Sequence, residues 1–197
     1  MRQRILAAAV QEFSRNGYSG ARIDRIAAAA GANKRMLYYH VGNKEVLYLT
    51  VLEGAYAQIR EAEHALELQM LAPPDAIGRL VEFTWAYYLA HPEFMALLNE
   101  ENLHAARHLR KSGRVKTMHS PFVQMIEQIL RRGVESGVFR PGVDAVQLYI
   151  SIAGLAYFYL SNQATLSTIF GRDLLAKPAK AARLAHMTDL VLAALRP

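Results

Sequence analysis

The sequence predicts an all-α fold of about nine helices. Apolar residues recur at a helical period of about 3.6 in nearly every segment, and no segment shows the apolar–polar alternation of a β-strand. Proline and glycine interrupt these segments at helix-length intervals. With 197 residues, 52% of them hydrophobic, the chain is long enough to bury a substantial core.

Three short helices are expected in the first quarter of the chain, over residues 2–15, 22–30 and 34–40. The apolar residues of the first helix form one stripe. Asn16-Gly17 ends this helix, and Gly31 ends the second, because glycine readily takes the left-handed conformation. Asn33 is a suitable N-cap for the third helix, whose inward residue is expected to be Leu37.

A longer helix is expected from its N-cap Asn43 to about Met70, as a connector between the first quarter and the rest. Pro73-Pro74 is the clearest break, since proline fixes φ and restricts the residue before it. Five further helices are expected, from the N-cap Asp75 to Leu89, from Glu93 to Leu109 after the His91-Pro92 break, from about Pro121 to Ser136, over 143–163 and over 179–195. Residues 143–163 are apolar nearly all round, so one face is expected on the core and another on a second subunit.

The excess positive charge is concentrated in residues 1–48. The whole chain has a formal net charge of +6. Residues 1–48 hold eight Lys and Arg against three acids, and the remaining residues hold fifteen against fourteen. A basic head on a near-neutral body is typical of a protein that binds a polyanion, whereas a randomly basic surface would spread the excess along the chain.

The predicted third helix is too polar for a core helix. It carries five residues suited to a nucleic-acid surface, Lys34, Arg35, Tyr38, Tyr39 and His40. We therefore expect a helix-turn-helix around Gly31, with its last helix in the major groove of DNA. The alternative is that the aromatic residues cover a small core while the charges are solvated. Two adjacent tyrosines cannot both point inward on one helix face, which weakens that alternative.

Residues 5–47 resemble the N-terminal domain of TetR/AcrR-type transcriptional regulators. The resemblance rests on four stretches in the family's order and spacing, Ile5–Phe13, Asn16–Tyr18, Ile23–Gly31 and Leu37–Leu47. The stretches that begin at His91 and Tyr157 are similar, less specifically, to C-terminal domains of this family. The resemblance implies a ligand-responsive repressor that binds a palindromic operator as a homodimer and is released by a small-molecule effector.

The same resemblance assigns roles to parts of the chain. It implies a helix-turn-helix DNA-binding domain over 1–48, a ligand-binding and dimerisation domain over 49–197, and a homodimer through the helices 143–163 and 179–195. The residues expected at DNA are Arg22, Asn33, Lys34, Arg35, Tyr38, Tyr39, His40 and Lys44. Of these, Lys34, Arg35 and Tyr39 would face bases or groove edges, Tyr38 a base or a phosphate, and His40 and Lys44 phosphates. Two residues depart from the family's pattern, since Arg22 stands where Thr is common and Met36 where a hydroxyl residue is common.

The helices after Pro73-Pro74 supply aromatic and polar side chains for a small-molecule pocket. The residues expected to line it are Trp85, Tyr88, Asn99, Asn102, His104, Phe122, Tyr157 and Asn162. Rings beside His or Arg would suit an aromatic or anionic effector. For any single aromatic residue at helical spacing, a place in the core is the more common outcome.

No cofactor, metal or catalytic site is expected. The chain has no Cys and no P-loop, HExxH or GxSxG arrangement. Glu100, His104 and His108 follow one another at i, i+4, a spacing that can ligate a metal but also arises often on solvated helices. Glu100 and Glu101 diverge by about 100° on a helix and would not face one substrate. A helical enzyme or small-molecule carrier with an incidental basic N-terminus is the alternative function.

The chain also lacks the pattern of a membrane or secreted protein. It has no apolar run of about 18 residues and no signal-peptide pattern, and the absence of Cys fits a reducing compartment. We therefore expect a soluble, cytoplasmic protein with no membrane partner.

Overall fold

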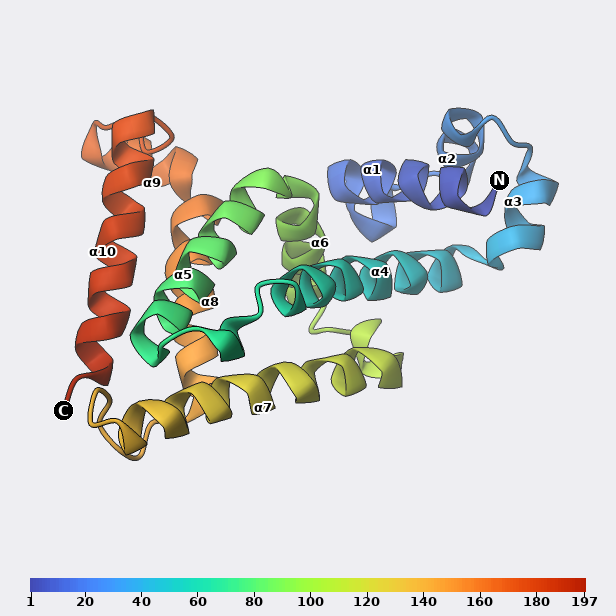
Figure 1. Cartoon of the computed structure of the whole chain (residues 1–197). Helices are drawn as coiled ribbons and strands as arrows, with labels where there is room; N and C mark the ends of the chain where they lie inside the picture. The colour runs from blue at the N-terminus through green and yellow to red at the C-terminus, as the bar shows by residue number, and fades with distance from the viewer. The chain divides into compact units, whose positions relative to one another are not determined.

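The computed structural model describes residues 1–197 and confirms the all-α class (Figure 1). The α-helices are α1 (Arg2–Gly20), α2 (Ile23–Ala30), α3 (Lys34–Val41), α4 (Lys44–His64), α5 (Pro73–Ala90), α6 (Pro92–Leu103), α7 (Gly113–Glu135), α8 (Ala145–Ser161), α9 (Gln163–Phe170) and α10 (Lys177–Leu195). Two 3₁₀ helices, η1 (Leu68–Met70) and η2 (Leu109–Lys111), complete the secondary structure. The additional helix relative to the sequence prediction is α9. No helix is both long and apolar enough to cross a membrane.

The chain folds into two compact units, each built from two segments. Unit 1 comprises Met1–Ile59 and His91–Met118, and unit 2 comprises Arg60–Ala90 and His119–Pro197. The unit boundaries therefore fall inside α4 and α7 as well as between α5 and α6. The functional division into residues 1–48 and 49–197 stays a prediction.

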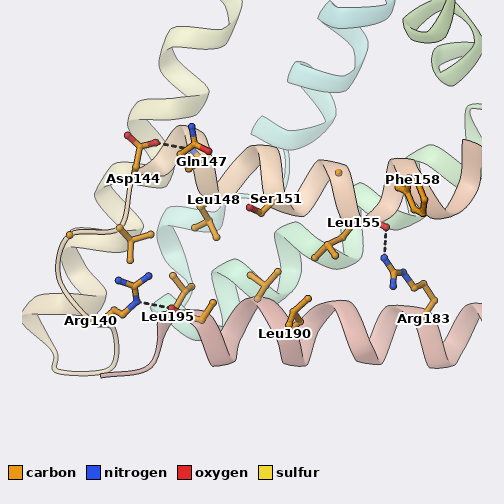
Figure 2. Close-up of a pocket in the computed structure, with 15 residues that line it drawn as sticks. Arg140, Asp144, Gln147, Leu148, Ser151, Leu155, Phe158, Arg183, Leu190 and Leu195 are labelled. Atoms are coloured by element: carbon orange, nitrogen blue, oxygen red, sulfur yellow. Dashed lines mark hydrogen bonds between the residues drawn. The ribbon is translucent and has the colours of Figure 1, made fainter. Parts of the chain in front are cut away.

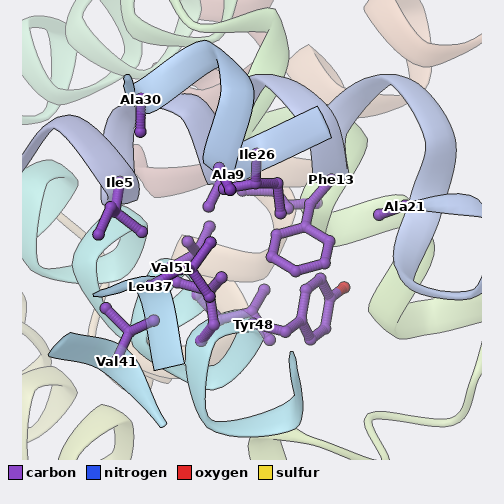
Figure 3. Close-up of a cluster of buried hydrophobic side chains, with 14 residues drawn as sticks. Ile5, Ala9, Phe13, Ala21, Ile26, Ala30, Leu37, Val41, Tyr48 and Val51 are labelled. Carbon is purple, nitrogen blue, oxygen red and sulfur yellow. The ribbon is translucent and has the colours of Figure 1, made fainter. Parts of the chain in front are cut away.

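Unit 1 is held together by an apolar core to which α1, α2, α3, α4 and α6 contribute (Figure 3). Ile5, Ala9 and Phe13 are buried at i, i+4 and i+8, which is the apolar stripe predicted for this helix. The Phe13 ring meets the Tyr48 ring edge-on, with the centroids 4.9 Å apart. Leu37 is fully buried, so the predicted inward residue of α3 is confirmed.

Glycine and asparagine set the ends of the short helices in unit 1. Gly17, at φ +64°, interrupts the helical backbone of α1, and Gly31, at φ +62°, closes α2 in the left-handed conformation. The predicted end at Gly31 is confirmed, whereas Gly17 breaks the helical backbone as predicted but α1 resumes after it and ends at Gly20. The Oδ1 atoms of Asn33 and Asn43 accept backbone N–H groups in the first turns of α3 and α4, at 2.8 and 2.9 Å. Both predicted N-caps are therefore confirmed as well.

The core of unit 2 forms where α5 packs against α8 and α10 (Figure 1). Ile77 and Leu80 on α5, Ile152 on α8 and Met187 on α10 are fully buried. Burying one such side chain contributes about 1.5–3 kcal/mol relative to leaving it exposed. The packing of these three helices therefore makes a large contribution to the stability of unit 2.

Two helix ends predicted from the sequence are wrong. The α4 helix ends at His64 rather than near Met70, and Glu67 then takes a left-handed backbone at φ +48° before η1. The α6 helix ends at Leu103 rather than Leu109, and Ala105 and Ala106 follow at φ +53° and +56°. A right-handed helix cannot continue through positive φ values.

Two predicted helix starts are also wrong. The α5 helix begins at Pro73, and Asp75 lies in its first turn rather than at the N-cap. Proline is tolerated there because its missing N–H has no intrahelical partner in the first turn. The α7 helix begins at Gly113 and contains Pro121 in its interior. Since proline has no backbone N–H, α7 lacks one helical hydrogen bond at Pro121.

Candidate functional site

The α3 helix has one face in the core and one face in solvent. Tyr39 is 86% exposed and Tyr38 is 46% exposed, whereas Leu37 and Val41 are buried. The alternative in which both tyrosines cover the core is therefore excluded. Arg35 is exposed as well. The solvent face of α3 thus presents a guanidinium and two phenol rings, all from residues that the sequence singled out.

Asn33 and His40 lie at the two ends of α3. The Asn33 side chain is used as the N-cap, and the residue is exposed. The His40 ring packs edge-on against the Tyr39 ring, with the centroids 5.3 Å apart. These two predicted residues therefore lie next to the exposed rings of the same helix.

Acidic side chains pair with two of the cations near α3, those of Lys34 and Arg25. Lys34 Nζ lies 2.6 Å from Asp24 Oδ1, and both side chains are more than half exposed. Glu12 of α1 accepts the main-chain N–H of Arg22, the N-cap residue of α2, at 3.0 Å. The same carboxylate lies 3.8 Å from Arg25 Nη1. Glu12 thus ties α1 to the start of α2 and leaves the Arg22 side chain in solvent.

The Lys44 ammonium is engaged inside unit 1. It donates a hydrogen bond to the Ala21 carbonyl at 2.6 Å and lies 5.0 Å from the centroid of the Tyr18 ring. Burial lowers the pKa of Lys44, against the raising influence of the Glu12 carboxylate. This geometry does not favour the predicted contact between the ammonium and a phosphate. Lys44 instead attaches the start of α4 to the segment between α1 and α2.

Arg4 joins α1 to the end of α2. Its Nε and Nη2 atoms donate to the Ala30 carbonyl at 2.9 and 2.5 Å. The guanidinium thus satisfies a terminal carbonyl that has no intrahelical partner. Arg4 contributes to the basic charge of residues 1–48, but its hydrogen bonds hold the helix frame together.

Two adjacent carboxylates of α6 make separate contacts in unit 1. Glu100 accepts the main-chain N–H of Tyr18 at 2.6 Å. Glu101 is buried, accepts two backbone N–H groups of the following segment, and lies 2.6 Å from His108 Nδ1. His104 Nε2 faces Glu100 at 3.3 Å. The structure places no three His, Cys, Asp or Glu residues where they could hold a metal ion together.

The residues predicted to line one pocket are divided between the two units. Unit 1 holds Asn99, Asn102 and His104, and unit 2 holds Trp85, Tyr88, Phe122, Tyr157 and Asn162. Asn102 and His104 are exposed, whereas Trp85, Tyr88 and Phe122 are buried. The Asn162 amide donates to the Phe158 carbonyl at the end of α8, at 2.9 Å. Of the predicted pocket residues in unit 2, Trp85, Tyr88 and Phe122 are the ones that lie in its interior.

Unit 2 also buries an arginine–glutamate pair that was not predicted from the sequence. Arg60 Nη2 lies 2.8 Å from Glu63 Oε1 at the end of α4, and the side chains are 8% and 1% exposed. Arg60 Nη2 also donates to the Tyr149 hydroxyl at 2.9 Å, and its Cζ lies 4.1 Å from the centroid of the Phe122 ring. Burial raises the pKa of Glu63 to about 8, although the Arg60 charge opposes this rise. In the sequence, the i, i+3 spacing of the two charges was the only signal.

An open groove of about 700 Å³ runs between α8 and α10 of unit 2 (Figure 2). Most of its lining side chains are apolar, among them Leu148, Leu155, Phe158, Leu190 and Val191. Phe158 is 60% exposed and Leu190 is 47% exposed. Toward one end, Arg183 Nη2 donates to the Leu155 carbonyl at 2.6 Å. Apolar side chains that are gathered and exposed in this way are typical of an interaction surface.

Two family profiles match the chain. The profile described as "Bacterial regulatory proteins, tetR family" matches residues 5–51. The profile described as "Tetracyclin repressor-like, C-terminal domain" matches residues 73–191. The first match includes the exposed face of α3, and the second includes α8 and most of α10.

Known proteins resemble the chain over most or all of its length. The HTH-type transcriptional repressor NicS of Pseudomonas putida is 43% identical over 195 residues, which are 99% of this chain and 92% of that protein. The HTH-type transcriptional repressor SCO4008 of Streptomyces coelicolor is 35% identical over 78% of this chain and 74% of its own length. The structure of the transcriptional regulator FadR from Bacillus subtilis, in complex with stearoyl-CoA, matches with a TM-score of 0.75 over 100% of both chains, at 16% identity.

Proposed function

The chain belongs to the TetR family of bacterial regulatory proteins, and we propose that it acts on a palindromic operator as a homodimer. As a member of this family, it is a ligand-responsive DNA-binding repressor and not an enzyme. The family resemblance of the sequence is thereby confirmed. Regulators of this family bind DNA operators, act as dimers and bind small molecules. The alternative of a helical enzyme or carrier is not favoured.

The two-sided character of α3 carries the proposed mode of DNA binding. Leu37 anchors the helix in the core of unit 1, while Tyr39 on the other side is 86% exposed. The major groove admits one α-helix and displays a distinct hydrogen-bonding pattern for each base pair. A short helix with a buried anchor and exposed donors is therefore suited to enter that groove.

The proposed contacts follow from the exposed groups. Arg35, Lys34 and Tyr39 would meet base edges or the groove wall, and a guanidinium can bond a guanine edge through two N–H groups. Tyr38 would meet a base or a phosphate, and the side chains of His40 and Arg22 would meet phosphates. Asn33 would act through its N-cap, which orients the first turn of α3. For the start of α4, we propose that the main-chain N–H groups bind a phosphate while Lys44 holds the helix in place.

We assign the homodimer contact to α8 and α10, within the predicted segments 143–163 and 179–195. Phe158 on α8 and Leu190 on α10 line the groove and are each about half exposed. A second copy of the same groove would remove these apolar groups from water, and twofold interfaces of this kind are the most common among oligomers. Two copies of α3 would then address the two halves of a palindrome.

We further propose that the effector binds in unit 2 and that α4 transmits its presence to the DNA-binding helices. The α4 helix has residues in both units. Its first turn is attached to the α1–α2 segment through Lys44, and its last turns carry Arg60 and Glu63. A ligand that binds one conformation more tightly shifts the population toward it, so a change in α4 would release the operator.

A gel-shift experiment tests the proposal. The probe is the DNA upstream of the protein's own gene, with an excess of unrelated DNA as competitor. We expect a shifted band that survives the competitor and weakens steeply as salt is raised, because phosphate contacts release counterions. No shift at low salt, or a shift abolished equally by any DNA, would refute operator binding by this chain.

A further inference from the structure

Unit 2 encloses a polar cluster whose hydrogen-bonding groups are only partly used. Arg60 Nη2 donates to Glu63 Oε1 and to the Tyr149 hydroxyl, at 2.8 and 2.9 Å. Arg60 Nε, Arg60 Nη1 and Glu63 Oε2 are buried and have no hydrogen-bond partner. An unsatisfied buried polar group destabilises the fold, and more so if it is charged. Three such atoms in one cluster indicate a place where a ligand can supply the partners.

Aromatic rings hold the Arg60 guanidinium and determine how a ligand can approach it. The Phe122 ring lies over the guanidinium, 4.1 Å from Cζ to the ring centroid, and the Tyr149 ring lies at 5.3 Å. The two rings meet edge-on, with the centroids 5.0 Å apart. Rings that cover the face of a guanidinium leave its N–H edges for hydrogen bonds. Nη2 lies between Nε and Nη1 and is already bonded to Glu63 and Tyr149, so an anionic oxygen can meet either unpaired nitrogen singly.

The charge balance of the cluster favours an anionic partner. Burial raises the pKa of Glu63 to about 8, so this carboxyl balances only part of the Arg60 charge at neutral pH. Burial also raises the pKa of Tyr149, whose hydroxyl hydrogen-bonds with Tyr88, so this phenol stays neutral. A buried cation without a counterion is costly. An amine would be repelled by Arg60, and a neutral amide would satisfy N–H groups but not the charge.

We infer that Arg60, Glu63 and Tyr149 form the recognition site for the charged group of the effector, and that this group is a carboxylate. One of its oxygens accepts a hydrogen bond from an unpaired Arg60 nitrogen, and the other accepts one from protonated Glu63. Phe122 and Tyr149 supply apolar ring surface for the body of the ligand. This inference rests on the proposed function, since it names the ligand class of the effector.

Benzoate, with benzamide and benzylamine as its neutral and cationic counterparts, is the probe for this site. We expect benzoate to raise the unfolding temperature and to bind more tightly than either counterpart at matched ionic strength. Arg60→Gln is expected to weaken benzoate binding about 10- to 100-fold, the size of a lost charged hydrogen bond. Arg79→Gln is the matched control, because Arg79 and Glu82 form an ion pair at the same i, i+3 spacing on the surface of unit 2.

Proton uptake gives a second readout that a purely structural pair would not show. At about pH 8.5 much of Glu63 is ionised in the free protein, so benzoate binding should draw a proton onto it. Calorimetry in two buffers of different ionisation enthalpy measures this uptake. Glu63→Gln, which keeps a neutral donor, should bind benzoate without taking up a proton. If Arg60→Gln fails to fold, the difference in proton uptake between the wild type and Glu63→Gln still tests the inference.

Several results would overturn the inference. They are equal binding of benzoate and benzamide, equal affinity of Arg60→Gln and Arg79→Gln, or no proton uptake by the wild type. The operator gel shift is run on the same preparations in the absence of benzoate, benzamide and benzylamine. Retained operator binding without carboxylate selectivity would overturn this site and leave the proposed function standing, whereas loss of operator binding by the wild type would count against the proposed function.

Discussion

Replacing Tyr39 with alanine is expected to weaken operator binding and to leave folding intact. The side chain is 86% exposed, and its ring neighbour is His40 on the same helix. Surface substitutions usually change stability by no more than about 0.5 kcal/mol, which is about 2 °C or less in unfolding temperature for a chain of this size. Loss of a base contact costs about 1–3 kcal/mol per half-site. Since a homodimer carries two copies, the operator Kd should rise about 30-fold or more.

Leu37→Ala is the matched control. Leu37 lies two positions earlier on α3 and is fully buried in the core of unit 1. Removing a buried leucine side chain costs about 2–5 kcal/mol, which corresponds to a fall of about 5 °C or more in unfolding temperature. The two variants therefore separate contact with DNA from contact with the core.

Fluorescence anisotropy with a labelled operator duplex measures the Kd, and circular dichroism measures the unfolding temperature. Two results would refute the reasoning. An unfolding temperature that falls as far in Tyr39→Ala as in Leu37→Ala would show that the Tyr39 ring is packed. A normally folded Tyr39→Ala with unchanged Kd would remove this ring from the DNA interface.

Three further predictions concern unit 2. Gly133→Ala should destabilise the protein by on the order of 3 kcal/mol, because a Cβ there would lie 2.0 Å from Cδ2 of the buried Phe139 ring; an unchanged urea midpoint would contradict this. The pKa of Glu63, about 8 instead of the usual 4.5, means that the folded state holds this proton more tightly than the unfolded chain. The free energy of unfolding should therefore fall as pH rises from about 4.5 through about 8, by up to roughly 1.4 kcal/mol per pH unit, and Glu63→Gln should flatten this profile in denaturant titrations; a stability difference between the two proteins that is the same at every pH would count against it. Phe158→Glu should yield monomers in analytical ultracentrifugation and weaken operator binding, and persistent dimers would place the interface elsewhere.

Helix ends were predictable from the sequence where a single residue sets them. Gly17 and Gly31 take the positive φ values that glycine favours, and Asn33 caps α3 with its own side chain. The end of α6 was not predictable in this way. Ala105 and Ala106 have positive φ values although alanine favours right-handed helix. These two residues precede His108, whose backbone N–H and ring contact the buried Glu101 carboxylate. The local sequence does not reveal this contact.

The solvent face of α3 was predictable for a related reason. Lys34, Arg35 and Tyr39 are polar or amphipathic residues in a short helix whose anchor, Leu37, is plainly apolar, so the division into two faces follows from the residue types. The engagement of Lys44 with the Ala21 carbonyl was not predictable, because a lysine at a helix start is equally suited to solvent or to a phosphate.

The sequence by itself determined the all-α class, the caps of the short helices and the family, because periodicity, capping and motif spacing are local properties of the chain. Only the tertiary structure decided which charges are buried. Arg60–Glu63 and Arg79–Glu82 have the same residue types at the same spacing, yet the first pair is enclosed and the second is more than half exposed. The difference lies in the side chains of other helices, Phe122 and Tyr149, that cover the first pair. Burial depends on residues distant in the chain, and this is why the proposed effector site became visible only in the fold.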